Sequence, residues 1–267
     1  MAITVVIMVV VMSWLVGKAI SRPVSYQRLS RFARQARLNA AAEQLEVVRC
    51  YLEVTRRWRV MGVAGAICFT LAEGLRRNAI HLDLYIVLSG WFVGAVFAEW
   101  RLNTPPAGKK RRALLISRRQ ASYLSPAHRT IPPTAALVAL TVGGLNITDG
   151  AAIAQNIVVI GWVVAVMAAI VAASRRVLER PQPFDADPVG HQADDALRAR
   201  SLSVLSGSAT ALILISLANL IVQSARLGSG SWEAVAATLV VLAPVIGGLM
   251  AINTRSRRIV TKAVALP

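Results

Sequence analysis

The sequence contains little cysteine, histidine or acid. Its 267 residues include 2 Cys, 3 His and 13 Asp or Glu. Two cysteines and three dispersed histidines are too few for a disulfide scaffold or a common zinc cluster, so we expect no disulfide, metal or other cofactor in the fold. The acids are outnumbered by 30 Lys and Arg, which gives a formal net charge of +17.

Sequence motifs of common catalytic sites are missing as well. The chain has no Gly-x-Ser-x-Gly turn, no His-Glu-x-x-His, no Gly-x-x-x-x-Gly-Lys loop and no Cys-x-x-Cys. A retinal protein would need a Schiff-base Lys inside the last apolar segment, Trp232–Asn253, and this segment has none. The sequence therefore predicts a protein that is not an enzyme, with no catalytic residue to name.

Apolar residues dominate what is present. Hydrophobic residues make up 55% of the chain and charged residues 16%, and the mean hydropathy is +0.55. A basic nucleic-acid-binding domain would be more polar, and a disordered basic tail would have fewer apolar residues. High hydropathy with a basic surplus instead predicts an all-α protein, a polytopic transmembrane helix bundle, and it makes nucleic acid an unexpected partner.

Seven segments approach the roughly 20 apolar residues that a membrane-crossing helix needs. They are Ala2–Ile20, Val60–Leu75, Leu82–Trp100, Pro133–Ile147, Ala151–Ser174, Leu202–Gln223 and Trp232–Asn253. These seven predicted spans divide the chain into an N-terminal membrane anchor at 1–20, a long cytoplasmic amphipathic helix at 21–59 between spans one and two, a six-span bundle of three hairpins at 60–253 and a cytoplasmic tail at 254–267. Whether the three hairpins are true repeats stays open.

The placement of the cations predicts an orientation. Residues 18–59 hold 10 Lys or Arg, 101–129 hold 8, 175–200 hold 5 and 255–262 hold 4, so 27 fall on one side and only Arg76, Arg77 and Arg226 on the other. Because positive loops stay in the cytoplasm, we expect a multi-pass cell-membrane protein with its N-terminus outside and its C-terminus cytoplasmic. The first apolar run precedes its positive charges, which predicts an uncleaved anchor and not a signal peptide.

The segment 21–59 has the composition of a basic amphipathic helix. No Gly or Pro occurs between Val24 and Met61, and apolar residues recur at spacings of three and four. Four cations lie on the complementary arc: Arg28, Arg31, Arg34 and Arg37. A second basic run consists of Lys109, Lys110, Arg111 and Arg112. Binding to anionic lipid headgroups at the cytoplasmic face and docking of a membrane or cytoplasmic protein partner are both open interpretations.

Three acids lie within or beside the predicted spans: Glu73, Asp83 and Glu99. Glu73 precedes Arg76 and Arg77 by three and four residues, which predicts a local ion pair. Asp83 follows His81 at the outer start of span three, and Glu99 lies one turn from its cytoplasmic end. A proton or cation pathway through these acids is the alternative, because ionisable groups inside spans are costly and often functional.

Small and polar residues mark further candidate positions. Gly90 and Gly94 predict a close helix approach, within the bundle or in a dimer. Asn219 belongs to a polar span six, whose hydroxyl and amide groups we expect to bond to neighbouring helices or to the preceding turn. Pro244 removes one backbone hydrogen bond from span seven and predicts a kink.

The cytoplasmic loop 175–201 contains the main acidic cluster of the chain. Its members are Asp185, Asp187, His191, Asp194 and Asp195. Asp and His are cation ligands, but the order of ligands required by an EF-hand is absent. We therefore predict a solvated loop broken by Pro188, with the last acids at a helix N-terminus.

Three stretches carry a resemblance to other proteins: Tyr51–Arg59, Gly90–Arg101 and Leu115–Pro126. They resemble a group of uncharacterised polytopic membrane proteins of high-GC actinobacteria, which implies an integral membrane protein and no particular activity.

The sequence leaves several functions open. The first is a non-enzymatic scaffold, accessory or permease-like subunit. The second is a small-solute transporter or channel with spans six and seven lining the path. A third, a membrane-embedded lipid enzyme, would need two or more of Glu73, His81, Asp83 and Glu99 to converge within hydrogen-bond reach.

Overall fold

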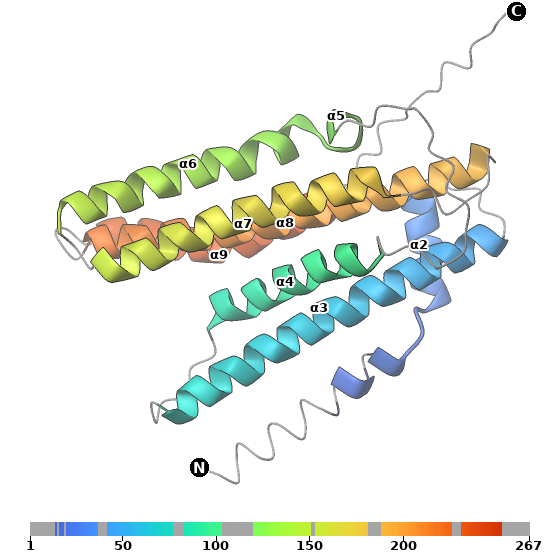
Figure 1. The fold of residues 1–267 in the computed structure, drawn as a ribbon, viewed down its shortest axis with the longest axis horizontal. Helices are drawn as coiled ribbons and strands as arrows, with labels where there is room; N and C mark the ends of the chain where they lie inside the picture. The colour runs from blue at the N-terminus through green and yellow to red at the C-terminus, as the bar shows by residue number, and fades with distance from the viewer. Residues whose placement is uncertain are drawn as a thin grey trace, which may run out of the picture. The chain divides into compact units, whose positions relative to one another are not determined.

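The fold is described from a computed structural model, which covers residues 14, 16–18, 20–36, 42–76, 83–102, 120–150, 153–180, 188–225 and 231–252. All regular secondary structure in these residues is helical, which confirms the all-α class. The helices are α2 (Tyr26–Ala36), α3 (Ala42–Arg76), α4 (Leu84–Leu102), α5 (Gln120–Tyr123), α6 (Pro126–Thr148), α7 (Ile153–Glu179), α8 (Pro188–Ala225) and α9 (Ser231–Ile252) (Figure 1). The chain divides into two compact units, Met1–Pro106 (unit 1) and Ala107–Pro267 (unit 2).

Unit 1 consists of a helical hairpin, α3 and α4, with α2 against α3. The hairpin is close because glycines meet at the crossing. A Cβ on Gly62 or on Gly90 would collide with the backbone of the other residue, and a Cβ on Gly94 would collide with the carbonyl of Trp58. Gly90 and Gly94 therefore produce the predicted close approach inside the unit, between α4 and α3.

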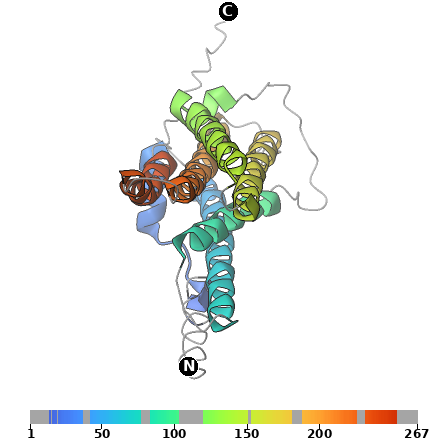
Figure 2. The same ribbon diagram turned by 90° about the vertical axis from the view of Figure 1, so that its left-hand side faces the viewer.

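Unit 2 surrounds one central helix. Helices α6, α7 and α9 all pack against α8, which lies between them in Figure 2. In its apolar stretch 89% of residues are buried, compared with 22% to 33% for the four other membrane-length helices of the described chain. The contact between α8 and α9 repeats the crossing of unit 1, because a Cβ on Gly207 or Gly247 would collide with the backbone of the other residue.

In the part of the chain that the structure describes, five helices are long and apolar enough to cross a membrane: Val48–Arg76, Pro126–Thr148, Ile153–Glu179, Ala193–Ser224 and Trp232–Ile252. Each contains most or all of one predicted span. Helix α4 corresponds to the predicted span Leu82–Trp100 and is not among the five. Most of the first predicted span, Ala2–Ile20, lies outside the described residues.

Two predicted boundaries lie inside longer helices. Helix α3 runs from Ala42 to Arg76, so the predicted junction at residue 59 falls within it. Residues 37–41, between α2 and α3, lie outside the described part of the predicted amphipathic helix. Helix α6 begins at Pro126 and continues through Pro132 and Pro133, so the helix starts seven residues before the predicted span Pro133–Ile147.

Candidate functional site

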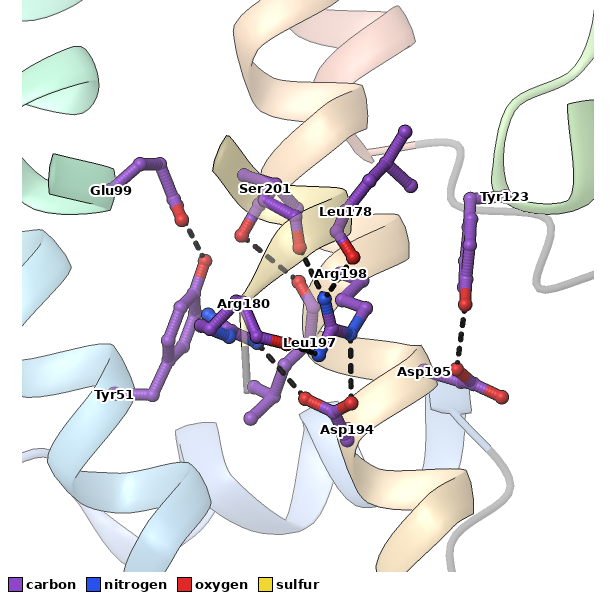
Figure 3. Close-up of polar contacts among 11 residues, drawn as sticks. Tyr51, Glu99, Tyr123, Leu178, Arg180, Asp194, Asp195, Leu197, Arg198 and Ser201 are labelled. Carbon is purple, nitrogen blue, oxygen red and sulfur yellow. Dashed lines mark hydrogen bonds and ion pairs between the residues drawn. The ribbon is translucent and has the colours of Figure 1, made fainter. Parts of the chain in front are cut away.

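The most buried charges of unit 2 form a cluster of one carboxylate and two guanidinium groups where α7 ends and α8 begins (Figure 3). Asp194 Oδ2 accepts a hydrogen bond from Arg198 Nε at 2.7 Å, and Asp194 Oδ1 accepts one from Arg180 at 3.2 Å. Asp194 and Arg198 are fully buried, and the Arg180 side chain is 9% exposed. The prediction that the acids of this loop are solvated is therefore wrong for Asp194.

Arg198 also caps the end of α7. Its guanidinium donates to the carbonyls of Val177, Leu178 and Arg180, of which the Leu178 contact measures 3.1 Å. The last four carbonyls of a helix have no partner within the helix, and they form the negative end of its dipole. The Arg198 guanidinium satisfies carbonyls at this end, and the partial negative charge of the helix end offsets part of the excess positive charge of the cluster. Arg198 thereby joins the C-terminus of α7 to α8.

Asp195 ties the short helix α5 to α8. The Tyr123 hydroxyl donates to Asp195 Oδ1 at 2.9 Å (Figure 3). Asp185 and Asp187 of the predicted acidic cluster, and the side chain of His191, lie outside the described part of the chain. Among the described residues no group of three or more His, Cys, Asp or Glu is placed to hold a metal ion.

A buried histidine of unit 2 links α6 to α9. His128 Nε2 lies 2.7 Å from the carbonyl oxygen of Met250, and Nδ1 lies 2.6 Å from Ser125 Oγ. Since a carbonyl only accepts, Nε2 carries the proton, and in the neutral ring the Ser125 hydroxyl donates to Nδ1. His128 on α6 thus satisfies a carbonyl in the last turn of α9.

A proline explains the bond from α8 to the same histidine. Pro132 has no N–H, so the carbonyl of His128, four residues earlier, loses its helical donor. Ser206 Oγ of α8 donates to this carbonyl at 2.7 Å and replaces the missing bond. The hydroxyl therefore allows α6 to continue through the prolines in the packed interior.

Amide side chains join α6, α7 and α8 at the opposite end of unit 2. Asn146 Nδ2 donates to the Leu220 carbonyl at 2.9 Å and lies 3.4 Å from Asn156 Oδ1, and Ser224 Oγ donates to Asn146 Oδ1. Asn146 and Asn156 are both buried. The central helix is thus held by polar contacts near both of its ends.

The three acids predicted as candidate positions all lie in unit 1. Glu73 forms the predicted ion pair with Arg76 at 2.7 Å. Asp83 Oδ1 accepts from the Tyr85 N–H at 2.8 Å and caps α4 at its N-terminus. Glu99 is buried and accepts a hydrogen bond from the Tyr51 hydroxyl at 3.0 Å (Figure 3).

Asp83 and Glu99 do not form one site. Asp83 and Glu99 flank opposite ends of α4, and at a rise of 1.5 Å per residue their backbones are about 24 Å apart. Arg77 and His81 lie outside the described residues. The convergence that a lipid enzyme would need is therefore absent for Asp83 and Glu99.

The residues of spans six and seven that could line a transport path differ in their exposure. Ser206 and Thr210 are buried, and their hydroxyls donate to backbone carbonyls. Asn219 is exposed, and Pro244 is half-buried on α9. The predicted bonding of span-six hydroxyls to neighbouring helices and preceding turns is confirmed for Ser206, and for Thr210, Ser208 and Ser216.

The predicted basic surface is described only in part. Arg28, Arg31 and Arg34 are exposed on α2, while Val24, Leu29 and Phe32 beside them are buried. Arg37, Lys109, Lys110, Arg111 and Arg112 lie outside the described residues.

Sequence reasoning missed the buried cluster and the histidine. The spacing of Asp194 and Arg198, four residues apart, was a signal for a helical pair. Asn146 and Asn156, amides inside two predicted spans, were a second signal. Nothing in the sequence connected Arg180 to Asp194 or His128 to Met250, because these contacts exist only once the helices are packed.

No family model, curated protein or solved structure matches the chain. The resemblance to actinobacterial membrane proteins stays a prediction.

Proposed function

We propose that the chain is a seven-span cell-membrane protein whose bundle is a non-enzymatic scaffold, accessory or permease-like subunit. In this proposal the N-terminus is outside, the C-terminus is cytoplasmic, and the basic cytoplasmic segments contact anionic lipid headgroups or a protein partner.

The distribution of polarity in unit 2 supports the membrane part of the proposal. Large apolar side chains lie on its surface, with Val158 70% exposed, Val241 67% and Leu137 65%. The polar side chains of α8, including Ser206 and Thr210, are buried instead. In water, so much exposed apolar surface would be unfavourable to hydrate. In a membrane, lipid tails solvate this surface, and the buried polar groups bond to neighbouring helices.

The same arrangement favours a structural over a transporting bundle. In the described residues around α8, the hydroxyls that could line a path are bonded to carbonyls, and the crossing at Gly207 and Gly247 brings two backbones together. The transport alternative therefore has less support.

Two native cysteines allow a test of the orientation. Cys50 and Cys68 are free and exposed on α3. In a Cys68→Ala protein we expect a membrane-impermeant maleimide to label Cys50 only after cells are permeabilised, because Cys50 belongs to a cytoplasmic segment. Asp149→Cys, placed in the outer turn between α6 and α7 of a protein lacking both native cysteines, is the control and should react in intact cells. The reverse pattern would refute the orientation.

Purification of the full chain in mild detergent tests the subunit role. A stoichiometric protein that co-purifies under these conditions would support it, and a single monodisperse species would contradict it.

A further inference from the structure

The segment that precedes α2 is held by two side chains of α3. The Val24 N–H donates to Glu53 Oε1 at 3.2 Å, and the guanidinium of Arg56 donates to the carbonyl of Arg22. Glu53 also accepts from Arg49 Nε at 3.3 Å. The Glu53 carboxylate is therefore engaged by Val24 and Arg49, and the Arg22 carbonyl by Arg56 itself.

Arg56 keeps one donor that nothing in the described chain satisfies. Its Nε is buried and has no hydrogen-bond partner. Arg28 on α2 and Arg57 on α3 are its like-charged neighbours, and Glu53 is the acid that interacts with it. Arg49, Arg56 and Arg57 all interact with the carboxylate of Glu53, which also accepts from the Val24 N–H, and Arg28 adds a further like charge beside Arg56. An unsatisfied buried donor beside uncompensated like charges is costly, and an anion would relieve both costs.

We propose that Arg28, Arg56 and Arg57 form a binding site for a phosphate group. A guanidinium presents a planar set of donors that matches two oxygens of a phosphate, and several guanidiniums together can satisfy its remaining acceptors. Arg28 and Arg57 are exposed, so an incoming anion can reach the site.

The aromatic residues beside the site favour a phospholipid as the source of the phosphate. Trp58 stacks on Phe97 with ring centroids 5.9 Å apart, and Trp100 meets the edge of Phe97 at the same distance. Phe97 and Trp100 are about half exposed. Tryptophan gathers at the headgroup level of membranes, which places Arg56 and Arg57 at the depth of lipid phosphates. The inference rests on the proposed membrane location and extends it to a defined lipid site.

The test uses the full chain, delipidated in detergent, with phosphatidylglycerol as the probe and diacylglycerol, which lacks phosphate, as the comparison lipid. The double variant Arg28→Gln/Arg57→Gln removes two cations of the site and keeps the bond from Arg56 to Arg22. Arg31→Gln/Arg34→Gln removes two exposed cations of α2 outside the site and is the matched control. We expect the Kd for phosphatidylglycerol, measured by calorimetry, to be at least about tenfold higher in the first variant than in the second.

Inorganic phosphate at constant ionic strength separates the two sources. Tighter binding of phosphatidylglycerol than of phosphate supports a lipid site, and equal binding supports a site for free phosphate. An equal loss of affinity in both double variants, or binding of diacylglycerol as tight as that of phosphatidylglycerol, would overturn the proposal. If the first variant does not fold, Arg57→Gln is compared with Arg34→Gln. Since binding is measured in detergent, its outcome is independent of the orientation that cysteine labelling tests.

Discussion

Asp194 joins two buried guanidinium groups in the interior of unit 2, because its carboxylate is the acceptor for both Arg180 and Arg198. Asp194→Asn would leave two buried guanidinium groups without a counter-charge. We expect it to lower the free energy of unfolding by about 3–5 kcal/mol, the usual cost of breaking a buried pair. Denaturant unfolding of the purified protein in detergent measures this loss.

Asp149→Asn is the matched control, since Asp149 is exposed in a turn, and it should change stability by no more than about 0.5 kcal/mol. The double variant Asp194→Leu/Arg198→Leu should lose less unfolding free energy than the two single variants lose together. Each single variant leaves the other member of the pair as a buried charge without its partner, whereas the double variant removes both charges. If Asp194→Asn and Asp149→Asn changed the free energy of unfolding equally, the cluster would contribute nothing to stability.

Residues whose partners are near in sequence could be predicted, and those with distant partners could not. The ion pair of Glu73 with Arg76 follows from a spacing of three within one helix. Asp194 was assigned to solvent because loop acids are usually exposed, yet α8 begins at Pro188 and carries it into the interior. Its partner Arg180 lies at the end of another helix, and no local pattern contains that information.

Among the helix pairs too, one close contact was predicted from the sequence and another was found only in the packed structure. The Gly90–Gly94 spacing predicted a close approach, and α4 makes it with α3. Helices α8 and α9 cross in the same manner at Gly207 and Gly247, whereas a Cβ on Gly143 of α6 would meet the side chain of Ile160 on α7. Two of the three hairpins therefore share a backbone-to-backbone crossing, and the third differs.

Neighbouring glycines on α9 permit a prediction for this crossing. A Cβ on Gly247 would strike the backbone of Gly207, while a Cβ on Gly248 would meet nothing within 4 Å. We expect Gly247→Ala to destabilise the protein by about 1–3 kcal/mol through overpacking. Gly248→Ala should be neutral or stabilising by up to about 1 kcal/mol, because alanine favours a helix. Thermal unfolding in detergent distinguishes them, and equal stability of the two variants would contradict the crossing.

Among the residues that the structure describes, composition predicted the all-helical class and the apolar segments predicted the positions of five membrane-length helices. It could not show which helix lies at the centre of unit 2. Mean hydropathy does not separate α8 from its neighbours, because a buried helix and a lipid-facing helix are both apolar. The difference lies in the hydroxyls of α8, each of which needs a carbonyl on its own or another helix, as Ser206 finds on α6.

On the apolar surface of unit 2, the stability cost of a Lys substitution should depend on how deep in the membrane the substituted residue lies. Val241 and Val235 are both exposed on α9, the first near its middle and the second near its start. If lipid surrounds α9, Val241→Lys should cost about 2.5–3.5 kcal/mol, since a cation at the centre of the bilayer is poorly solvated. Val235→Lys should cost much less, because its ammonium group reaches the headgroups. The fraction of protein recovered in the membrane and its unfolding free energy in vesicles measure both effects. If water surrounded α9, both substitutions would be nearly neutral, so equal stability of the two variants would exclude a membrane around this face.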